Sequence, residues 1–146
     1  MLRLEGSLKS FMIPLTFSGR VQRGQGIATG LGCPTANISI EGGVVIPALG
    51  VYIGKTELDG SFYPSLVYVN DGRDGAILKI EVHLLDECLD LQGKILFVCL
   101  LDKLRGMEPW KSDAFIKDLV ARDLDDARSW FAGHPKEARR DFDGCG

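Results

Sequence analysis

The sequence predicts a mostly β fold, a small closed antiparallel barrel with one α-helix packed on it near the C-terminal end. Short segments of alternating apolar and polar residues, separated by tight turns, are typical of half-buried strands. One later segment has the three- and four-residue spacing of an amphipathic helix. A closed barrel is favoured over an open sheet because closure leaves no strand edge exposed.

The first strand is expected at residues 15–22, where apolar and polar side chains alternate. The apolar residues within 38–46 are interrupted by Gly42-Gly43 and followed by Pro47. Short extended pieces are therefore more plausible there than a helix.

A hairpin is expected next. Residues 50–58 and 61–69 are strand-like and flank Asp59-Gly60, a strong two-residue turn signal. Pro64 has no N–H to donate to a ladder, so it should lie toward an edge or bulge.

Two further runs complete the meander of strands. Residues 77–85 follow the turn at 70–75, and residues 94–103 follow Gly93. Both runs are rich in β-branched and apolar residues, which favours strands.

The helix is expected to begin after Ser112, a natural N-cap, and to end at Gly133, which Pro135 follows. It would span about 18 residues and lie across the sheet. Its apolar stripe contains Phe115, Ile116, Leu119, Val120, Leu124, Ala127, Trp130 and Phe131.

Length and composition fit one globular domain. The chain has 146 residues, of which 45% are hydrophobic and 25% charged, close to the average for globular proteins. A core of this size is stable without staples. We expect a single domain over residues 1–146, with its core at about 14–131 and peripheral, solvent-exposed tails at 1–13 and 134–146.

Charge and cysteine usage narrow the function classes. The net charge of -3 gives no general positive field to attract nucleic acid or anionic lipid. Cys33, Cys88, Cys99 and Cys145 lie far apart without metal-ligand spacing, so free thiols in a reducing cytosol are expected. No signal peptide or apolar run of ~20 residues is present. We therefore expect a cytoplasmic monomer that binds neither nucleic acid nor membrane.

The segment between the first strand and Pro34 is rich in glycine. Glycine lets backbone N–H groups approach an anion closely, but the spacing here matches neither the Walker nor the dinucleotide pattern. An anion-binding loop and a flexible turn region are about equally supported. The glycines concerned are Gly24, Gly26, Gly30 and Gly32.

Thr35 and Asn37 follow this loop directly. On an extended segment, side chains two residues apart project to the same side, and both residues offer oxygen atoms acceptable to Mg²⁺. Pro34 would hold the approach stiff. Simple turn capping is the alternative, and the pattern alone favours it.

Glu81 is the candidate general base. Within residues 77–86 the even positions from 78 to 84 are apolar, so Lys79, Glu81 and His83 share the opposite face. An ordinary solvated strand face is the alternative that this pattern alone favours. His83 fits an orienting or surface residue better than a catalyst.

Arg105 and Trp110 lie between the last strand and the helix. An arginine near an indole ring could bind a flat ligand or a phosphate group. A loop anchored by Trp110 is the equally supported alternative.

In combination, an ordered series of motifs resembles the riboflavin kinase family over about residues 14–131. Pro-Thr-Ala-Asn in this setting is specific, whereas each other motif alone is weak. In chain order the motifs are Gly-x-Val-x-x-Gly at 19–24, Leu-Gly-x-Pro-Thr-Ala-Asn at 31–37, Gly-Val-Tyr at 50–52, Glu-Val-His-Leu-Leu at 81–85, Asp-Leu-x-Gly at 90–93, Leu-Arg at 104–105 and a terminal helix ending at 123–128.

The resemblance implies a six-stranded antiparallel Greek-key barrel with a C-terminal helix packed on it. It also implies transfer of the γ-phosphoryl group of ATP to the 5′-hydroxyl group of riboflavin, giving FMN and ADP with the help of Mg²⁺ or another divalent cation. The implied roles are metal and phosphate binding by Thr35 and Asn37, covering of the nucleotide by the glycine loop and Pro34, proton acceptance by Glu81, and flavin binding by Arg105 and Trp110.

Some positions depart from the family pattern. Many members carry arginines where this chain has Gln25, Ile27 and Ala28, and Gln92 and Gly106 also differ. These departures motivate an alternative, a flavin- or nucleotide-binding barrel without turnover, while a purely structural barrel would not explain Pro-Thr-Ala-Asn. The segment before the barrel is too short for the adenylyltransferase domain of bacterial relatives, so we expect no FAD synthesis.

Overall fold

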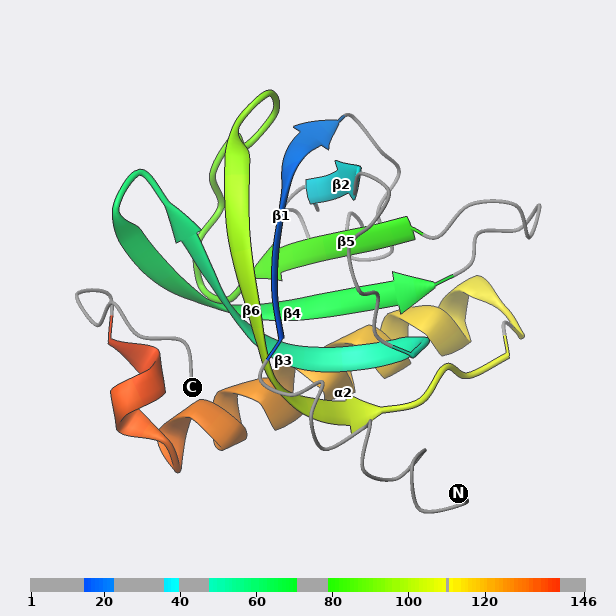
Figure 1. The fold of residues 1–146 in the computed structure, drawn as a ribbon. Coiled ribbons are helices and arrows are strands. Elements are labelled where there is room, and N and C mark those ends of the chain that lie inside the picture. Colours follow the sequence, from blue (N-terminus) through cyan, green and yellow to red (C-terminus); the bar gives the residue numbers. More distant parts are fainter. Residues whose placement is uncertain (1–14, 23–35, 40–47, 71–78, 110, 140–146) are drawn as a thin grey trace, which may run out of the picture.

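The structure is a computed structural model that describes residues 15–22, 36–39, 48–70, 79–109 and 111–139 of the chain. Within these ranges six antiparallel strands close into a barrel in the order β1-β2-β5-β4-β3-β6, and a long helix lies against its outside (Figure 1). The elements are β1 (Leu15–Gln22), β2 (Ala36–Ser39), β3 (Gly50–Leu58), β4 (Ser61–Asn70), β5 (Lys79–Leu84), β6 (Ile95–Arg105), the α-helix α2 (Asp113–Ala132) and the short 3-10 helix η2 (Pro135–Ala138).

The barrel and its terminal helix confirm the fold that the sequence predicts. The Asp59-Gly60 turn joins β3 to β4, and both residues have the positive φ angles that a tight hairpin turn needs, 50° and 87°. Pro64 lies at the end of the β4–β5 ladder, whose register starts at Ser65, and its carbonyl oxygen accepts from the N–H of Leu85 just beyond β5. A proline is tolerated at such a ladder end because its missing N–H interrupts no continuing row of bonds.

Two apolar cores follow from the alternation of side chains along the strands. One fills the barrel, and the other lies between the outer barrel wall and α2. The inner core is made of Phe17, Val21, Ala36, Ile38, Tyr52, Leu58, Val67, Val69, Ile80, Val82, Leu84, Leu91, Leu96, Val98 and Leu100. The outer core is made of Val51, Ile53, Leu66, Tyr68, Leu85, Val120, Leu124, Ala127 and Phe131.

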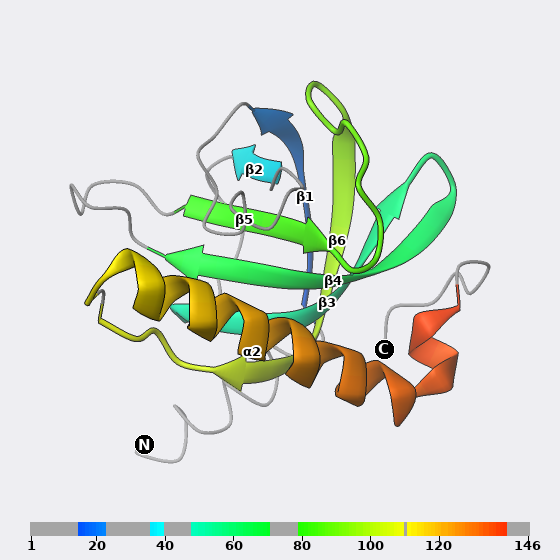
Figure 2. The same cartoon turned by 180° about the vertical axis from the view of Figure 1, so that it is seen from behind.

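Helix α2 begins where the sequence predicts. The backbone N–H of Phe115 donates to the Ser112 hydroxyl oxygen at 3.1 Å, which satisfies one of the free N–H groups of the first turn. At the other end, the N–H of Gly133 donates to the carbonyl oxygens of Ser129 and Trp130. The apolar stripe of α2 faces the barrel, across which the helix runs in Figure 2.

In the tail expected after residue 133, the first residues form a short helix and are not all solvent-exposed. Pro135–Ala138 form η2, and Glu137 is partly buried. Its carboxylate lies 3.5 Å from the ammonium group of Lys55, whose side chain has no exposed surface. The burial of Lys55 and its ion pair could not be predicted, because the sequence alone does not show which segment covers the outer wall of the barrel.

Replacing Glu137 by Gln should lower the free energy of unfolding by about 3 kcal/mol, because the buried ammonium group of Lys55 loses a charged partner. Lys55→Met should cost less, since an apolar side chain of similar length fills the same space while the partly exposed Glu137 regains water. Urea unfolding of the three proteins measures both differences. An unchanged midpoint in Glu137→Gln would show that this ion pair contributes nothing.

The cysteine expectation needs a correction. Cys88 and Cys99 are both disulfide-bonded, so the expectation of free thiols is wrong at these positions. The spacing of the cysteines in the sequence does not reveal this disulfide bonding, because folding brings together residues that lie apart in sequence. Cys33 and Cys145 lie outside the described residues. Neither helix in the described part of the chain has the length and apolar character needed to cross a membrane.

Candidate active site

The candidate site lies on the outer face of the barrel, along one row of paired residues. Asn37 on β2 is the register partner of Glu81 on β5, and Glu81 is in turn the partner of Tyr68 on β4. The row continues through Val51 on β3 to Arg105 on β6. Directly opposed residues in antiparallel strands place their side chains on the same face, with Cβ atoms about 5 Å apart.

Glu81 and Asn37 are the adjacent polar pair of this row. Their chain neighbours, among them Ile80 and Val82, point into the barrel core, so Glu81 and Asn37 point outward. Glu81 is nevertheless only 4% exposed. The alternative of an ordinary solvated strand face is therefore wrong at Glu81, because neighbouring structure covers this part of the wall.

The carboxamide oxygen of Asn37 is buried and accepts no hydrogen bond from the described residues. A buried polar atom without a partner costs about 1–3 kcal/mol, and a bound ion or ligand is one way in which such an atom is satisfied. An amide oxygen beside a carboxylate is the kind of ligand that Mg²⁺ prefers. Asn37 therefore fits the metal-binding role that the sequence predicts for it.

Arg105 is aimed by an irregularity in β6. Tyr52 pairs with Lys103 but Val51 pairs with Arg105, so one extra residue of β6 is inserted between these two pairs. Such a bulge bends a strand and redirects its side chains. Gly50 allows the strand end to pass close by, because a Cβ atom there would lie 2.7 Å from the carbonyl oxygen of Arg105.

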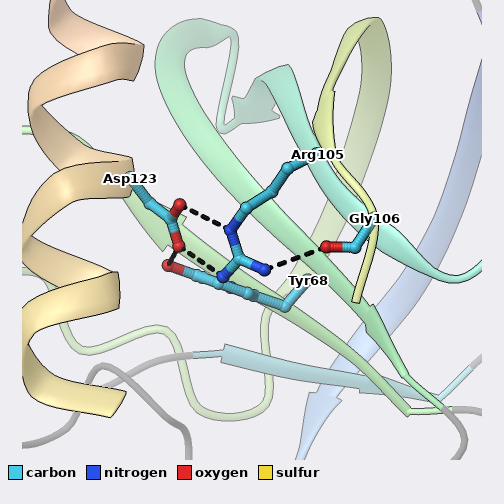
Figure 3. Close-up of polar contacts among 4 residues, drawn as sticks. All are labelled: Tyr68, Arg105, Gly106 and Asp123. Atoms are coloured by element: carbon cyan, nitrogen blue, oxygen red, sulfur yellow. Dashed lines mark hydrogen bonds and ion pairs between the residues drawn. The ribbon is translucent and has the colours of Figure 1, made fainter. Parts of the chain in front are cut away.

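The side chain of Arg105 is held by Asp123 on α2 (Figure 3). Its Nε donates to Asp123 Oδ1 at 2.7 Å and its Nη2 donates to Asp123 Oδ2 at 2.8 Å, while Nη1 donates to the carbonyl oxygen of Gly106 at 2.9 Å. The Tyr68 hydroxyl group donates to Asp123 Oδ2 over a longer 3.4 Å. A bidentate charge-assisted pair of this kind fixes the plane of the guanidinium group.

The protonation of this cluster follows from its contacts. Burial alone would lower the pKa of Arg105, but the hydrogen bonds and charge of Asp123 outweigh burial and raise it. Burial and the negative charge of Asp123 raise the pKa of Tyr68 well above its usual range. Arg105 is therefore always charged, and Tyr68 keeps the proton that it donates to Asp123.

His83 lies two residues beyond Glu81 on the same face of β5 and is 7% exposed. Burial and the nearby charge of Arg128 lower its pKa, and the charge of Asp86 opposes them only in part. Its Nδ1 atom is buried without a hydrogen-bond partner in the described structure. His83 is thus a neutral, buried member of the site wall, and the surface alternative is wrong for it.

Acidification should destabilise the chain through His83. Because the pKa of His83 is lower in the folded chain than its ordinary 6.5, the unfolded chain binds more protons between those two values. The free energy of unfolding therefore falls as the pH drops below about 6.5. In His83→Gln, the decrease in melting temperature from about pH 7.5 to about pH 5 should be smaller.

The unmodified chain, melted over the same pH range, provides the control. A His83→Gln variant with an unchanged pH dependence would contradict the assignment.

Of the residues that the sequence predicts for the site, the structure brings Asn37 and Glu81 together and places Arg105 in the same row, three strands beyond Glu81. The remaining ones lie outside the described residues, and their roles stay predictions. These are Gly24, Gly26, Gly30, Gly32, Pro34, Thr35 and Trp110.

Sequence reasoning missed Tyr68 and Asp123. A signal for Asp123 was present, because it lies three residues after Val120 and four before Ala127, on the apolar stripe of the helix. A carboxylate at such a position is rarely buried without a partner. Tyr68 gave no comparable signal, since an aromatic residue is ordinary in a strand.

Comparison with known proteins agrees with the family resemblance that the sequence motifs indicate. The riboflavin kinase family model (Flavokinase) matches residues 11–131. The bifunctional riboflavin kinase/FMN adenylyltransferase of Pseudomonas fluorescens is 33% identical over 123 residues, which cover 80% of this chain and 38% of the relative. The chain therefore spans well under half the length of that relative.

Two solved structures have a similar fold. A Streptococcus pneumoniae structure described as a macrolide-efflux protein superposes with a TM-score of 0.71 at 30% identity, over 80% of this chain and 39% of that one. Riboflavin kinase from Trypanosoma brucei superposes with a TM-score of 0.57 at 23% identity, over 80% and 79% of the two chains. The second likeness bears on the fold alone.

Proposed function

The chain belongs to the riboflavin kinase family, and we propose that it transfers the γ-phosphoryl group of ATP to the 5′-hydroxyl group of riboflavin, giving FMN and ADP. The observation that carries this proposal is the pairing of the buried Glu81 with Asn37, whose buried amide oxygen has no hydrogen-bond partner in the described part of the chain.

In the proposed reaction, the riboflavin hydroxyl oxygen attacks the γ-phosphorus atom, and the bond from that phosphorus to the β,γ-bridging oxygen breaks. ADP leaves with that oxygen, and the hydroxyl proton passes to the carboxylate of Glu81. Such a reaction asks the protein chiefly for alignment, charge stabilisation and a placed base. Glu81 lies on a barrel strand paired on both sides, which keeps its position fixed.

A divalent cation, Mg²⁺ in the simplest case, would be held by the Asn37 oxygen together with Thr35. When bound, it would neutralise negative charge on the ATP phosphate groups. Covering of the nucleotide by the glycine loop and Pro34 remains part of the proposal. Glu81 and the amide oxygen of Asn37 are largely shielded from water, since the residue Glu81 and that oxygen atom are buried.

The flavin would lie toward Arg105. The loop after Arg105 carries Met107, which is 40% exposed and offers an apolar contact to a flat ring. The two N–H groups of Arg105 that the hydrogen bonds described above leave unused could donate to the polar edge of that ring. Trp110 belongs to the same loop and keeps its proposed flavin-binding role.

Incubation with riboflavin, ATP and Mg²⁺, followed by chromatography, tests the proposal, and FMN is the expected product. Riboflavin binding without FMN would contradict kinase activity and support the alternative of a binding barrel without turnover. We further propose that the chain acts as a monomer in the cytoplasm, where ATP is available, which gel filtration and cell fractionation would test.

A further inference from the structure

Asp123 is a charged residue in an otherwise apolar interface. It is 1% exposed and lies on the stripe of α2 that packs against the barrel. A buried ion pair adds little stability compared with well-packed apolar residues of similar size. Docking of α2 alone therefore does not explain why a carboxylate stands at this position.

The contacts of Asp123 converge on one side chain. Its two carboxylate oxygens accept from Nε and Nη2 of Arg105, and the second oxygen also accepts from the Tyr68 hydroxyl group. A guanidinium group has five N–H donors in one plane. Three of them are engaged by Asp123 and Gly106, which leaves one N–H on each Nη in a fixed direction.

This cluster adjoins the proposed reaction centre. Tyr68 is the direct cross-strand partner of Glu81, and both side chains lie on the outer face of the barrel. Arg105 retains 21% of its side-chain surface, so its unused donors remain within reach of a ligand. The carboxylate of Asp123 thus connects α2 with Arg105 and with Tyr68, the residue beside the proposed base.

We propose that Asp123, supported by Tyr68, is a positioning residue that orients the guanidinium group of Arg105 toward the flavin side of the site. This inference rests on the proposed function. It assigns to α2 a part in riboflavin recognition, in addition to covering the barrel wall.

The test compares Asp123→Asn with Asp126→Asn, which removes the same charge from an exposed position of the same helix. In Asp123→Asn, one oxygen acceptor becomes an N–H₂ donor facing a donor of Arg105. We expect KM for riboflavin to rise about tenfold, with kcat and KM for ATP each changed by less than about threefold. Asp126→Asn should leave all three constants unchanged.

A double-mutant cycle shows whether Asp123 acts through Arg105. In an Arg105→Lys background the bidentate geometry is already lost, so adding Asp123→Asn should raise KM for riboflavin less than about twofold. Equal effects in both backgrounds would overturn the proposal. So would an Asp123→Asn variant with a lower melting temperature and an unchanged KM for riboflavin, because a merely structural clamp predicts that result.

If Asp123→Asn does not fold, Tyr68→Phe decides the question, since it removes only the hydroxyl group that supports Asp123. We expect KM for riboflavin to rise about two- to threefold, and an unchanged value would overturn the proposal. If the unmodified chain forms no FMN, the proposed function fails separately. Fluorescence titration of riboflavin without ATP then supports the inference if Asp123→Asn binds more weakly than Asp126→Asn, and overturns it otherwise.

Discussion

Replacing Glu81 by Gln should lower kcat for FMN formation about a thousandfold, because general bases of this kind contribute factors of roughly 10² to 10⁴. Glutamine has the same shape but cannot accept the hydroxyl proton. Glu81 is buried and paired through its backbone with both neighbouring strands, so the variant should keep the local structure. Riboflavin affinity should therefore stay within about threefold of the unmodified chain.

Single-turnover FMN formation measures this effect. Glu57→Gln is the matched control, because Glu57 lies on β3 near the hairpin, away from the row that holds Glu81. Its rate should equal that of the unmodified chain. A Glu81→Gln variant that keeps more than about a tenth of the rate would exclude Glu81 as the base.

The second large effect is expected at Asn37. Asn37→Leu removes the unpartnered carboxamide oxygen and keeps a side chain of similar size. Activity at about millimolar Mg²⁺ should fall at least a hundredfold, because the cation loses an oxygen ligand. Removing a buried acceptor that has no hydrogen bond should not cost stability, so the melting temperature should stay equal or rise.

Magnesium titration provides the internal control. If Asn37 binds the cation, raising Mg²⁺ should recover part of the activity by mass action. A variant that is both inactive and strongly destabilised, with no response to Mg²⁺, would contradict the metal-binding role of Asn37.

The fold could be predicted in detail because local signals agreed with one another. Ser112, the apolar stripe and Gly133 indicated the bounds of α2, and Asp59-Gly60 indicated the β3–β4 turn. In each case a few adjacent residues determine the conformation through caps, turns or alternation. Lys55 was missed because its partner Glu137 lies far away in sequence. The bonding of Cys88 and Cys99 was misjudged because cysteine spacing alone does not show which side chains meet.

Single residues of the candidate site could be predicted from the sequence, but their arrangement in the site could not. Alternation placed Glu81 and His83 on one face of a strand, but burial of that face depends on how the rest of the chain covers it. Arg105 could be identified as a candidate, whereas its pairing with Asp123 required the packing of α2 on the barrel. Register between β2 and β5 brought Asn37 next to Glu81, and no local pattern encodes that register.

The most direct measurement is the fate of a labelled phosphoryl group. The chain is mixed with riboflavin, Mg²⁺ and ATP labelled with ³²P at either the γ or the α position, and the flavin product is isolated. Our account predicts labelled FMN from γ-labelled ATP and an unlabelled flavin product from α-labelled ATP. A flavin that carries no label from γ-labelled ATP would contradict phosphoryl transfer by this site.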